Sequence, residues 1–348
     1  MPKKPVVLSI IIATYNSEKL IEKCLKAVQR QTLKPSSYEI LVIDGGSTDK
    51  TLAIADKYHA KIINNPRKEP VWAKFLGLQQ AKGRYILYLD SDEIIVSPES
   101  LYKKLIAFKE PNVRSVIGNG YLSPANMPFV NDYINEFGDP FSFFIYRLSK
   151  NAGFFLDSMK QQYSYQEKQG FTVFNFDKSK PLPIIELAAM ASSADRDYLV
   201  KKFPKVLKDM SLLPHFFYLL ASENQKLAIV HDDPLYHYSS DTLANYLKKI
   251  AWRVQNNIYH ISSLGKSGFS GRETFQPRSL QLRRYLFLPY AYSLVFPLLD
   301  SLLLAISRKN WKYVLHVPLT VFTATAIVYH LVLFISGYRP QIEAYGKK

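Results

Sequence analysis

Short apolar runs alternate with amphipathic stretches over the first 93 residues. Four runs have the length and composition of buried strands: residues 6–13, 39–43, 60–63 and 85–89. Three stretches between them have helical spacing of apolar positions: residues 18–31, 50–57 and 71–81. Strands that alternate with helices across short loops predict an α/β fold with a doubly wound parallel sheet. In such sheets, ligands bind at the carboxyl ends of the strands.

The last third of the chain has a different pattern. Apolar residues recur every three or four positions from Leu243 to Ile261, with Lys248, Lys249 and Arg253 between them. This pattern predicts an amphipathic basic helix, placed either at a membrane interface or against the sheet domain. Residues 285–307 and 313–338 then form two apolar segments, each long enough to cross a bilayer. Pro289, Pro297 and Asp300 indicate that the first segment is kinked or faces protein.

These patterns predict four parts. They are a cytoplasmic catalytic domain (1–239), an amphipathic interface helix with a linking loop (240–284), a transmembrane hairpin (285–338) and a cytoplasmic tail (339–348). More Lys and Arg residues lie outside the two apolar segments than in the loop between them, which predicts a multi-pass membrane protein with its catalytic domain in the cytoplasm.

Charge distinguishes between two classes of partner. The chain of 348 residues has a formal net charge of +16. Residues 241–348 hold 14 Lys/Arg against four Asp/Glu, in the same third as the apolar segments. Cations beside apolar segments favour anionic membrane lipids as the partner, and we expect no nucleic acid. The single cysteine, Cys24, excludes an internal disulfide and lies among apolar positions of a predicted helix.

Acidic residues follow two of the predicted strands. Asp90 and Asp92, separated by Ser91, come directly after the strand at 85–89, so their side chains share one direction. Carboxylates in this arrangement suit Mg²⁺ or Mn²⁺ bound together with substrate phosphates. A second acidic loop, 44–49, follows the strand at 39–43. The two loops together predict a nucleotide-sugar site.

The same stretches resemble glycosyltransferase family 2, whose members are inverting nucleotide-sugar enzymes. The matching segments are Ser9–Asn16, Ile43–Thr51 and Ala81–Glu93, in the family's order and spacing. The resemblance implies a nucleotide-diphosphate-sugar-binding, Rossmann-like fold of the GT-A type. It implies a donor site formed by Thr14, Asn16, Asp44, Ser47, Lys74, Asp90 and Ser91, with Mn²⁺ or Mg²⁺ at Asp90 and Asp92. Phe75 stands where the family often has asparagine.

Two further motifs concern the acceptor. The family usually supplies its catalytic base about 100 residues after the metal motif, in a Glu-Asp pair. The corresponding stretch here is Ser192–Leu199, so the resemblance implies Asp195 as the base, although Ala194 replaces the glutamate. Asp197 and a helix-capping role for Asp195 are the alternatives. Gln281, Arg284 and Tyr285 resemble the Gln-x-x-Arg-Trp motif of cellulose-synthase-like enzymes, which implies contact with the acceptor and the diphosphate. His237, His316 and His330 receive no assigned role.

We therefore expect a metal-dependent inverting glycosyltransferase that is anchored in the membrane. It would transfer a hexose, mannose from GDP-mannose by analogy, to a hydroxyl of a dolichyl- or polyprenyl-linked glycan. One alternative is a polyprenyl-phosphate sugar synthase, which needs no base because its acceptor is already ionised. The other is an inactive, membrane-tethered protein that binds nucleotide sugars.

Overall fold

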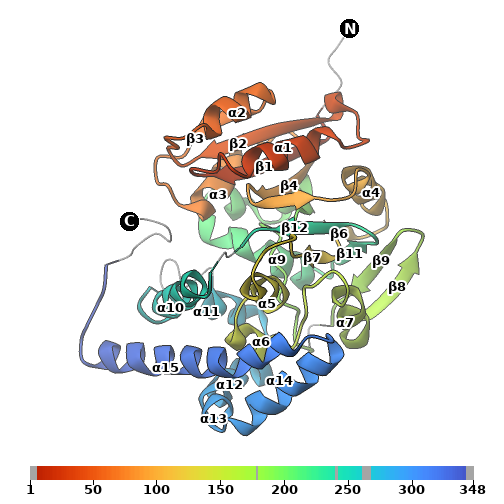
Figure 1. The fold of residues 1–348 in the computed structure, drawn as a ribbon. Helices are drawn as coiled ribbons and strands as arrows, with labels where there is room; N and C mark the ends of the chain where they lie inside the picture. Colours follow the sequence, from red (N-terminus) through yellow and green to blue (C-terminus); the bar gives the residue numbers. More distant parts are fainter. Residues whose placement is uncertain (1–5, 178, 240–241, 261–267, 342–348) are drawn as a thin grey trace. The chain divides into compact units, whose positions relative to one another are not determined.

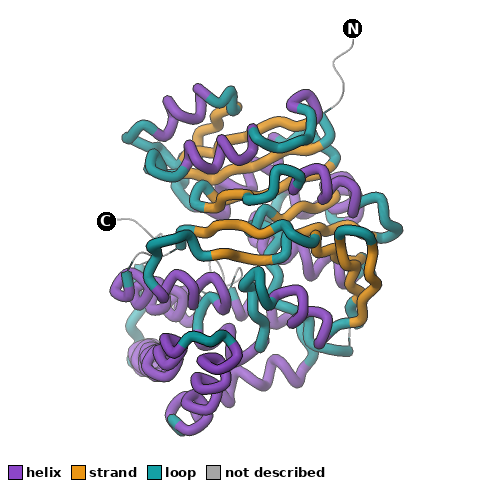
Figure 2. The backbone as a smooth tube through the Cα atoms, turned by 45° about the vertical axis from the view of Figure 1, so that its right-hand side comes forward, coloured by secondary structure: helices purple, strands orange, loops and turns teal. Residues whose placement is uncertain are grey.

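The computed structural model describes residues 6–177, 179–239, 242–260 and 268–341. The chain divides into two compact units that are interleaved in sequence. Unit 1 comprises residues 1–124, 150–177 and 185–238, and unit 2 comprises residues 125–149, 178–184 and 239–348. The described strands all belong to unit 1, whereas unit 2 is built from helices and loops (Figure 2). The domain boundaries expected at 239, 284 and 338 stay predictions.

Unit 1 is built on a nine-stranded sheet with the order β3-β2-β1-β4-β10-β6-β11-β9-β8 (Figure 1). Its strands are β1 (Leu8–Thr14), β2 (Tyr38–Asp44), β3 (Lys61–Asn64), β4 (Tyr85–Asp90), β6 (Val113–Ile117), β8 (Ser164–Lys168), β9 (Phe171–Asn175), β10 (Ser192–Asp195) and β11 (Lys226–Val230). The first four pair in parallel, as the sequence predicts. Beyond β4 the sheet is mixed, because β10 runs antiparallel to both β4 and β6.

Helices cover this sheet on both faces, and all seven residues of β1 are buried. The helices of unit 1 are α1 (Ile21–Gln29), α2 (Thr51–Lys57), α3 (Pro70–Gln80), α4 (Ser100–Ala107), α7 (Phe155–Gln162), α8 (Arg196–Lys202) and α9 (Phe216–Ser222). The three expected helices correspond to α1, α2 and α3. Close packing of α3 on β1 requires Gly77, because a Cβ there would lie 2.2 Å from Ile11 Cγ2.

A second, three-stranded sheet in unit 1 has the order β5-β12-β7. Its strands are β5 (Glu93–Ile95), β12 (Pro234–His237) and β7 (Gly120–Leu122). Strand β5 begins three residues after β4 ends, so this small sheet carries on from the Asp90–Asp92 loop.

Unit 2 contains the C-terminal helices and a segment inserted from the middle of the chain. Its helices are α5 (Phe129–Phe137), α6 (Pro140–Tyr146), α10 (Leu243–Tyr259), α11 (Phe269–Arg272), α12 (Arg278–Arg283), α13 (Phe287–Tyr292), α14 (Val295–Ser307) and α15 (His316–Ile335). The predicted amphipathic helix is α10, and Ile261 lies outside the described residues. Its apolar face is buried with residues of α5, α6 and α15, including Tyr133, Phe143 and Leu319.

The described residues of unit 2 do not form the two straight membrane spans that the sequence predicts. One described helix, Trp311–Ile335, is long and apolar enough to cross a membrane, with a mean hydropathy of 1.9. The other expected span, 285–307, is broken: the helical stretches Arg278–Tyr292 and Val295–Ser307 meet at 90°. Leu294 has a φ of 58° at the break, and Pro297 follows within the first turn of α14. Multi-pass topology is therefore not supported.

Candidate active site

Three neighbouring strands end at one edge of the large sheet. The parallel register pairs Thr14 with Asp44 and Ala13 with Asp90, so β1, β2 and β4 bring these residues to the same level. The chain moves from β1 outward through β2 to β3 and then returns to place β4 on the other side of β1. Such a reversal of strand order opens a crevice at the carboxyl ends of the strands, where ligands bind in open α/β sheets.

Asp44 anchors the loop that follows β2. Its buried Oδ2 accepts hydrogen bonds from the backbone N–H groups of Gly46 and Ser47, both at 2.8 Å. Asn16 ties the loop to the end of β1, because its N–H donates to Ser47 Oγ at 2.8 Å and its Oδ1 accepts from Thr48 N–H at 2.9 Å. Asn16 adopts a φ of 46°, a left-handed conformation that asparagine tolerates. These hydrogen bonds join the loop after β2 to the residues that follow β1.

Two hydroxyl groups lie between this loop and β4. Thr14 Oγ1 is buried and has no hydrogen-bond partner in the described part of the chain. Ser91, which is also buried, shares a hydrogen bond of 2.9 Å with Ser17. A buried hydroxyl without a partner is uncommon in folded proteins, and a ligand is one group that can satisfy it.

Asp90 forms an ion pair with a lysine from α3. Lys74 Nζ lies 2.7 Å from Asp90 Oδ1, with only 10% of the lysine side chain exposed. Burial alone would lower the pKa of Lys74, but the charges of Asp90, Glu186 and Glu93 raise it above its usual value. Lys74 therefore stays protonated beside Asp90. Phe75 packs in the core with its ring 5.4 Å from that of Trp72, so it offers no polar contact to a donor.

Glu93 follows the acidic loop at the start of β5. The sequence does not indicate a role for it in the site. It is fully buried and accepts hydrogen bonds from Asp90 N–H at 3.1 Å, Tyr121 O–H at 2.7 Å and Met190 N–H at 2.9 Å. Burial and the neighbouring charge of Asp90 raise the pKa of Glu93 to about 7. Neighbouring residues of a strand point to opposite faces of a sheet. This alternation is the signal in the sequence that could have assigned Glu93 to a different direction from Asp92.

His237 also reaches this loop. Pairing of β12 with β5 sets His237 opposite Glu93. The imidazole Nε2 lies 3.8 Å from Asp92 Oδ2, and the ring stacks on Tyr121 with 4.7 Å between centroids. The structure therefore places a histidine beside the second carboxylate of the predicted metal motif.

Asp90 and Asp92 fit a divalent cation that arrives with a diphosphate. About a third of each side chain is exposed, 30% for Asp90 and 35% for Asp92. Among the residues that the structure describes, no three His, Cys, Asp or Glu side chains form a closed metal site. Mg²⁺ and Mn²⁺ often bind to one or two carboxylates and complete their coordination with phosphate oxygens and water. The oxygen donors present suit that mode.

The structure does not bring Asp195 to this edge. Antiparallel pairing sets Asp195 opposite Tyr85, five residues before Asp90 on β4, which corresponds to a separation of about 17 Å along the strand. Its carboxylate is buried, lies 3.3 Å from both Arg84 and Arg114, and accepts the Tyr198 N–H at the start of α8. These contacts agree with the alternative that Asp195 caps helix α8. Asp197, which is largely exposed, follows within α8.

The segment before β10 carries a different carboxylate toward the Asp90 edge. Because β10 is antiparallel to β4, residues that precede Ser192 continue toward the end of β4, and Met190 already bonds to Glu93 there. Glu186 lies in this segment and is partly buried. Its charge acts on Lys74, the partner of Asp90.

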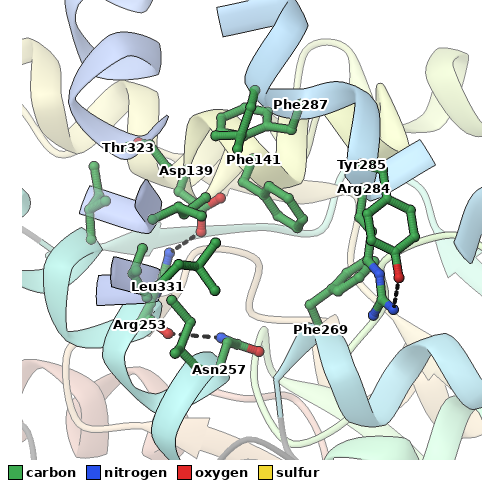
Figure 3. A pocket seen from close by; sticks show the side chains of 15 residues that line it. Asp139, Phe141, Arg253, Asn257, Phe269, Arg284, Tyr285, Phe287, Thr323 and Leu331 are labelled. Atoms are coloured by element: carbon green, nitrogen blue, oxygen red, sulfur yellow. Dashed lines mark hydrogen bonds and ion pairs between the residues drawn. The ribbon is translucent and has the colours of Figure 1, made fainter. Parts of the chain in front are cut away.

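Gln281, Arg284 and Tyr285 belong to unit 2 and make their contacts there. Gln281 Nε2 donates to the carbonyl oxygens of Glu273 and Gln276, and Arg284 pairs with Glu273 at 2.5 Å and donates to Tyr285 Oη at 2.7 Å. Arg284 and Tyr285 line a cavity of about 290 Å³ within unit 2 (Figure 3). Its other walls are mostly apolar residues of α10, α13 and α15.

The two histidines of α15 make internal contacts in unit 2. The buried His316 shares hydrogen bonds with Tyr133 at 2.5 Å and Tyr290 at 3.0 Å. The Tyr259 hydroxyl donates to the His330 carbonyl at 3.0 Å and lies 3.3 Å from His330 Nδ1. Both histidines thus link α15 to other helices.

Comparison with known proteins adds to this geometry. Residues 9–168 match the family described as Glycosyl transferase family 2. A poly(ribitol-phosphate) β-N-acetylglucosaminyltransferase of Staphylococcus aureus is 36% identical over 93 residues, which cover 25% of this chain and 16% of that protein. The chain thus spans about a sixth of this relative's length.

Two archaeal proteins are also similar. A dolichyl N-acetyl-α-D-glucosaminyl phosphate 3-β-D-2,3-diacetamido-2,3-dideoxy-β-D-glucuronosyltransferase of Methanococcus voltae is 40% identical over 87 residues, or 23% of this chain and 27% of that protein. The mannosyltransferase PcManGT of Pyrobaculum calidifontis, solved with GDP-mannose and Mn²⁺, shares the fold, with a TM-score of 0.52 and 15% identity over 95% of this chain and 90% of that chain. The sequence match to this family covers residues 9–168, which is slightly less than half of the chain, and the fold shared with PcManGT is an α/β, Rossmann-like fold of the GT-A type.

Proposed function

We propose that this protein is an inverting glycosyltransferase that transfers a hexose from a nucleotide sugar to a hydroxyl of a lipid-linked glycan. The observation that carries the proposal is the convergence of Asp44, Asp90 and the Lys74 ammonium at the carboxyl ends of β1, β2 and β4. The relative from M. voltae acts on a dolichyl-linked sugar, which supports a lipid-linked acceptor.

The donor would lie across the two loops at this edge. Asn16 and the loop held by Asp44 and Ser47 would contact the nucleoside, where their fixed backbone supplies hydrogen-bonding groups. Thr14 and Ser91 offer hydroxyl groups between the loops. Asp90 and Asp92 would hold Mn²⁺ or Mg²⁺, which when bound neutralises charge on the diphosphate. Lys74 holds Asp90 in place through their ion pair. GDP-mannose is the proposed donor, because PcManGT was solved with it.

Transfer to a hydroxyl requires a group that accepts its proton. Asp195 pairs with two arginines and lies opposite Tyr85, five residues before Asp90 on β4. This position is too far from Asp90 for a base that accepts the proton of the acceptor hydroxyl. Glu186 is a partly buried carboxylate on the Asp90 side. We therefore take Glu186 as the candidate base in place of Asp195.

The position of Asp195 also favours a second candidate function. A polyprenyl-phosphate sugar synthase needs no base, because its acceptor oxygen is already ionised. The two functions share the donor site and differ in the acceptor. Both would place the protein at a membrane, because both acceptors are lipid-linked.

A donor and acceptor screen tests the proposal. Purified protein in detergent is incubated with a panel of nucleotide sugars, with Mn²⁺ or EDTA, and with either a polyprenyl-phosphate or a short lipid-linked glycan. We expect release of one nucleoside diphosphate that requires both the metal ion and the glycan acceptor, and its loss in the Asp90→Ala/Asp92→Ala double variant. Transfer only to polyprenyl phosphate would establish the second function. Donor binding without turnover on any acceptor would contradict both and favour an inactive binding protein.

A further inference from the structure

Helices α13 to α15 expose a continuous series of large apolar side chains. On α14 the exposed residues are Leu298, Leu299, Leu302, Leu303 and Ile306, the last with 74% of its surface accessible. On α15 Ile335 reaches 82%. We call the exposed apolar residues of these helices the apolar face. Soluble proteins rarely expose so large an apolar surface unless a lipid or protein partner covers it.

Exposed aromatic and basic residues accompany the apolar face on α15 and in the turn before it. Trp311 is 76% exposed at the turn between α14 and α15, and Tyr329 is 59% exposed on α15. Lys309 and Lys312 lie in the same turn as Trp311. Trp and Tyr concentrate at the level of lipid headgroups, and Lys and Arg are attracted to anionic lipids. These residues complement a bilayer surface better than they complement an apolar protein groove.

Another side of α15 is covered by α10, a helix that carries several basic residues. The α10 helix packs against it, with Tyr259 hydrogen-bonded to His330 near the end of α15. This α10 helix carries Lys248, Lys249 and Arg253, and Arg253 forms an ion pair with Asp139 at 2.9 Å. If α15 crossed a bilayer upright, these charges would be carried to the depth of the hydrocarbon core, where each costs several kcal/mol.

The turn between α14 and α15 is bound to α5. Arg308 lies 2.8 Å from the fully buried Glu136, and the Tyr313 hydroxyl also donates to that carboxylate. The turn and the α10 contact at His330 thus join both ends of α15 to charged helices of unit 2. In addition, α14 has 13 residues, or about 20 Å, which is too short for a hydrocarbon core of about 30 Å.

From these observations we infer that unit 2 binds one leaflet of an anionic membrane through the apolar face, with α14 and α15 lying along the surface and neither helix crossing it. The inference takes the membrane attachment of the proposed function and specifies its mode. It does not depend on the transfer reaction, so the experiments below do not measure activity.

Topology is the first test. Cys24 is fully buried, and a Cys24→Ser background allows single cysteines to be introduced at Lys309 in the turn, at Ser336 after α15 and, as the reference, at the exposed Lys109 of unit 1. Each variant is labelled with a membrane-impermeant maleimide in spheroplasts and in inverted vesicles. We expect K309C and S336C to label from the same side as K109C. Labelling of either one from the opposite side would show a crossing helix and overturn the inference.

Membrane binding through the apolar face is the second test. Purified protein is floated with vesicles that contain phosphatidylglycerol. The Leu303→Asp/Ile306→Asp variant should bind at least about tenfold more weakly, since two side chains would carry charge into the lipid. Tyr102→Asp is the matched control, because Tyr102 is 52% exposed on unit 1. Circular dichroism and melting curves establish that both variants fold. Flotation that is absent in the wild type, or equal in all three proteins, would contradict the inference.

Discussion

At the scale of single residues, the ion pair between Lys74 and Asp90 connects stability to donor binding. Lys74 is nearly buried, so replacing it with methionine leaves Asp90 without its partner at the sheet edge. We expect Lys74→Met to lower the free energy of unfolding by about 1–3 kcal/mol, less than for a fully buried pair because the Asp90 side chain is 30% exposed. Urea denaturation measures this loss, and titration with nucleoside diphosphate and Mn²⁺ should show weaker binding.

The matched control is Lys103→Met. Lys103 pairs with Glu99 one helical turn away, but the two side chains are 30% and 56% exposed. Exposed pairs of this kind contribute about 0.5 kcal/mol or less. If Lys103→Met and Lys74→Met had equal effects on stability and on binding, Lys74 would not have the role given to it here.

Two carboxylates can be compared as the base. Glu186→Gln keeps the shape of the side chain and removes its ability to accept a proton, so turnover with a hydroxyl acceptor should fall by about 10² or more. Asp195→Asn should change turnover little. Steady-state kinetics with saturating donor measure both. A large loss in Asp195→Asn with normal turnover in Glu186→Gln would restore the assignment made from the sequence, whereas near-normal turnover in both would favour a phosphate acceptor.

At the scale of elements, Asp195 joins β10 to α8. Its carboxylate accepts the Tyr198 N–H as the N-cap and forms ion pairs with Arg84 and Arg114. Asp195→Ala removes the cap and both ion pairs, and we expect a loss of about 1–3 kcal/mol in the free energy of unfolding. Urea denaturation followed by tryptophan fluorescence measures it. Unchanged stability would mean that these contacts do not form in solution.

The elements that the sequence predicts well are those with a strong local pattern. Strands β1 to β4 and helices α1 to α3 could be predicted because apolar periodicity and short loops determine both their type and their parallel order. Strand β10 could not, because its four residues, Ser192–Asp195, contain no apolar run and form a strand only through pairing with β4 and β6. Its direction decides which edge Asp195 occupies, so the position of the predicted base could not be foreseen without this strand.

Hydropathy likewise failed to distinguish a span from a broken helix. The apolar composition of 285–307 is compatible with both. The bend at Leu294 depends on backbone conformation, and the packing of α14 after the bend depends on partners such as Arg147 at the end of α6, which pairs with Asp300 at 2.6 Å. Long-range contacts of this kind leave no periodic signal in the sequence.

At the scale of the whole molecule, charge and apolar surface are concentrated in the same third of the chain. Residues 241–348 hold 14 Lys/Arg and four Asp/Glu, and they include the apolar face. Electrostatic attraction acts at a distance and is screened by salt, whereas apolar burial requires contact and persists at high ionic strength. The two contributions to membrane binding can therefore be separated experimentally.

Raising salt from about 0.1 M to about 0.5 M should weaken binding to anionic vesicles about tenfold or more, because the Debye length falls well below its value of about 10 Å at 0.1 M. Each basic residue near an anionic surface contributes about 1 kcal/mol. Lys309→Glu/Lys312→Glu should therefore weaken binding at low salt and flatten the salt dependence. Leu303→Asp/Ile306→Asp should weaken binding at every salt concentration, because it removes the contribution that salt does not screen. Vesicle flotation across a salt series measures both variants, and wild-type binding that is independent of salt would mean that the cations of unit 2 do not face the lipid.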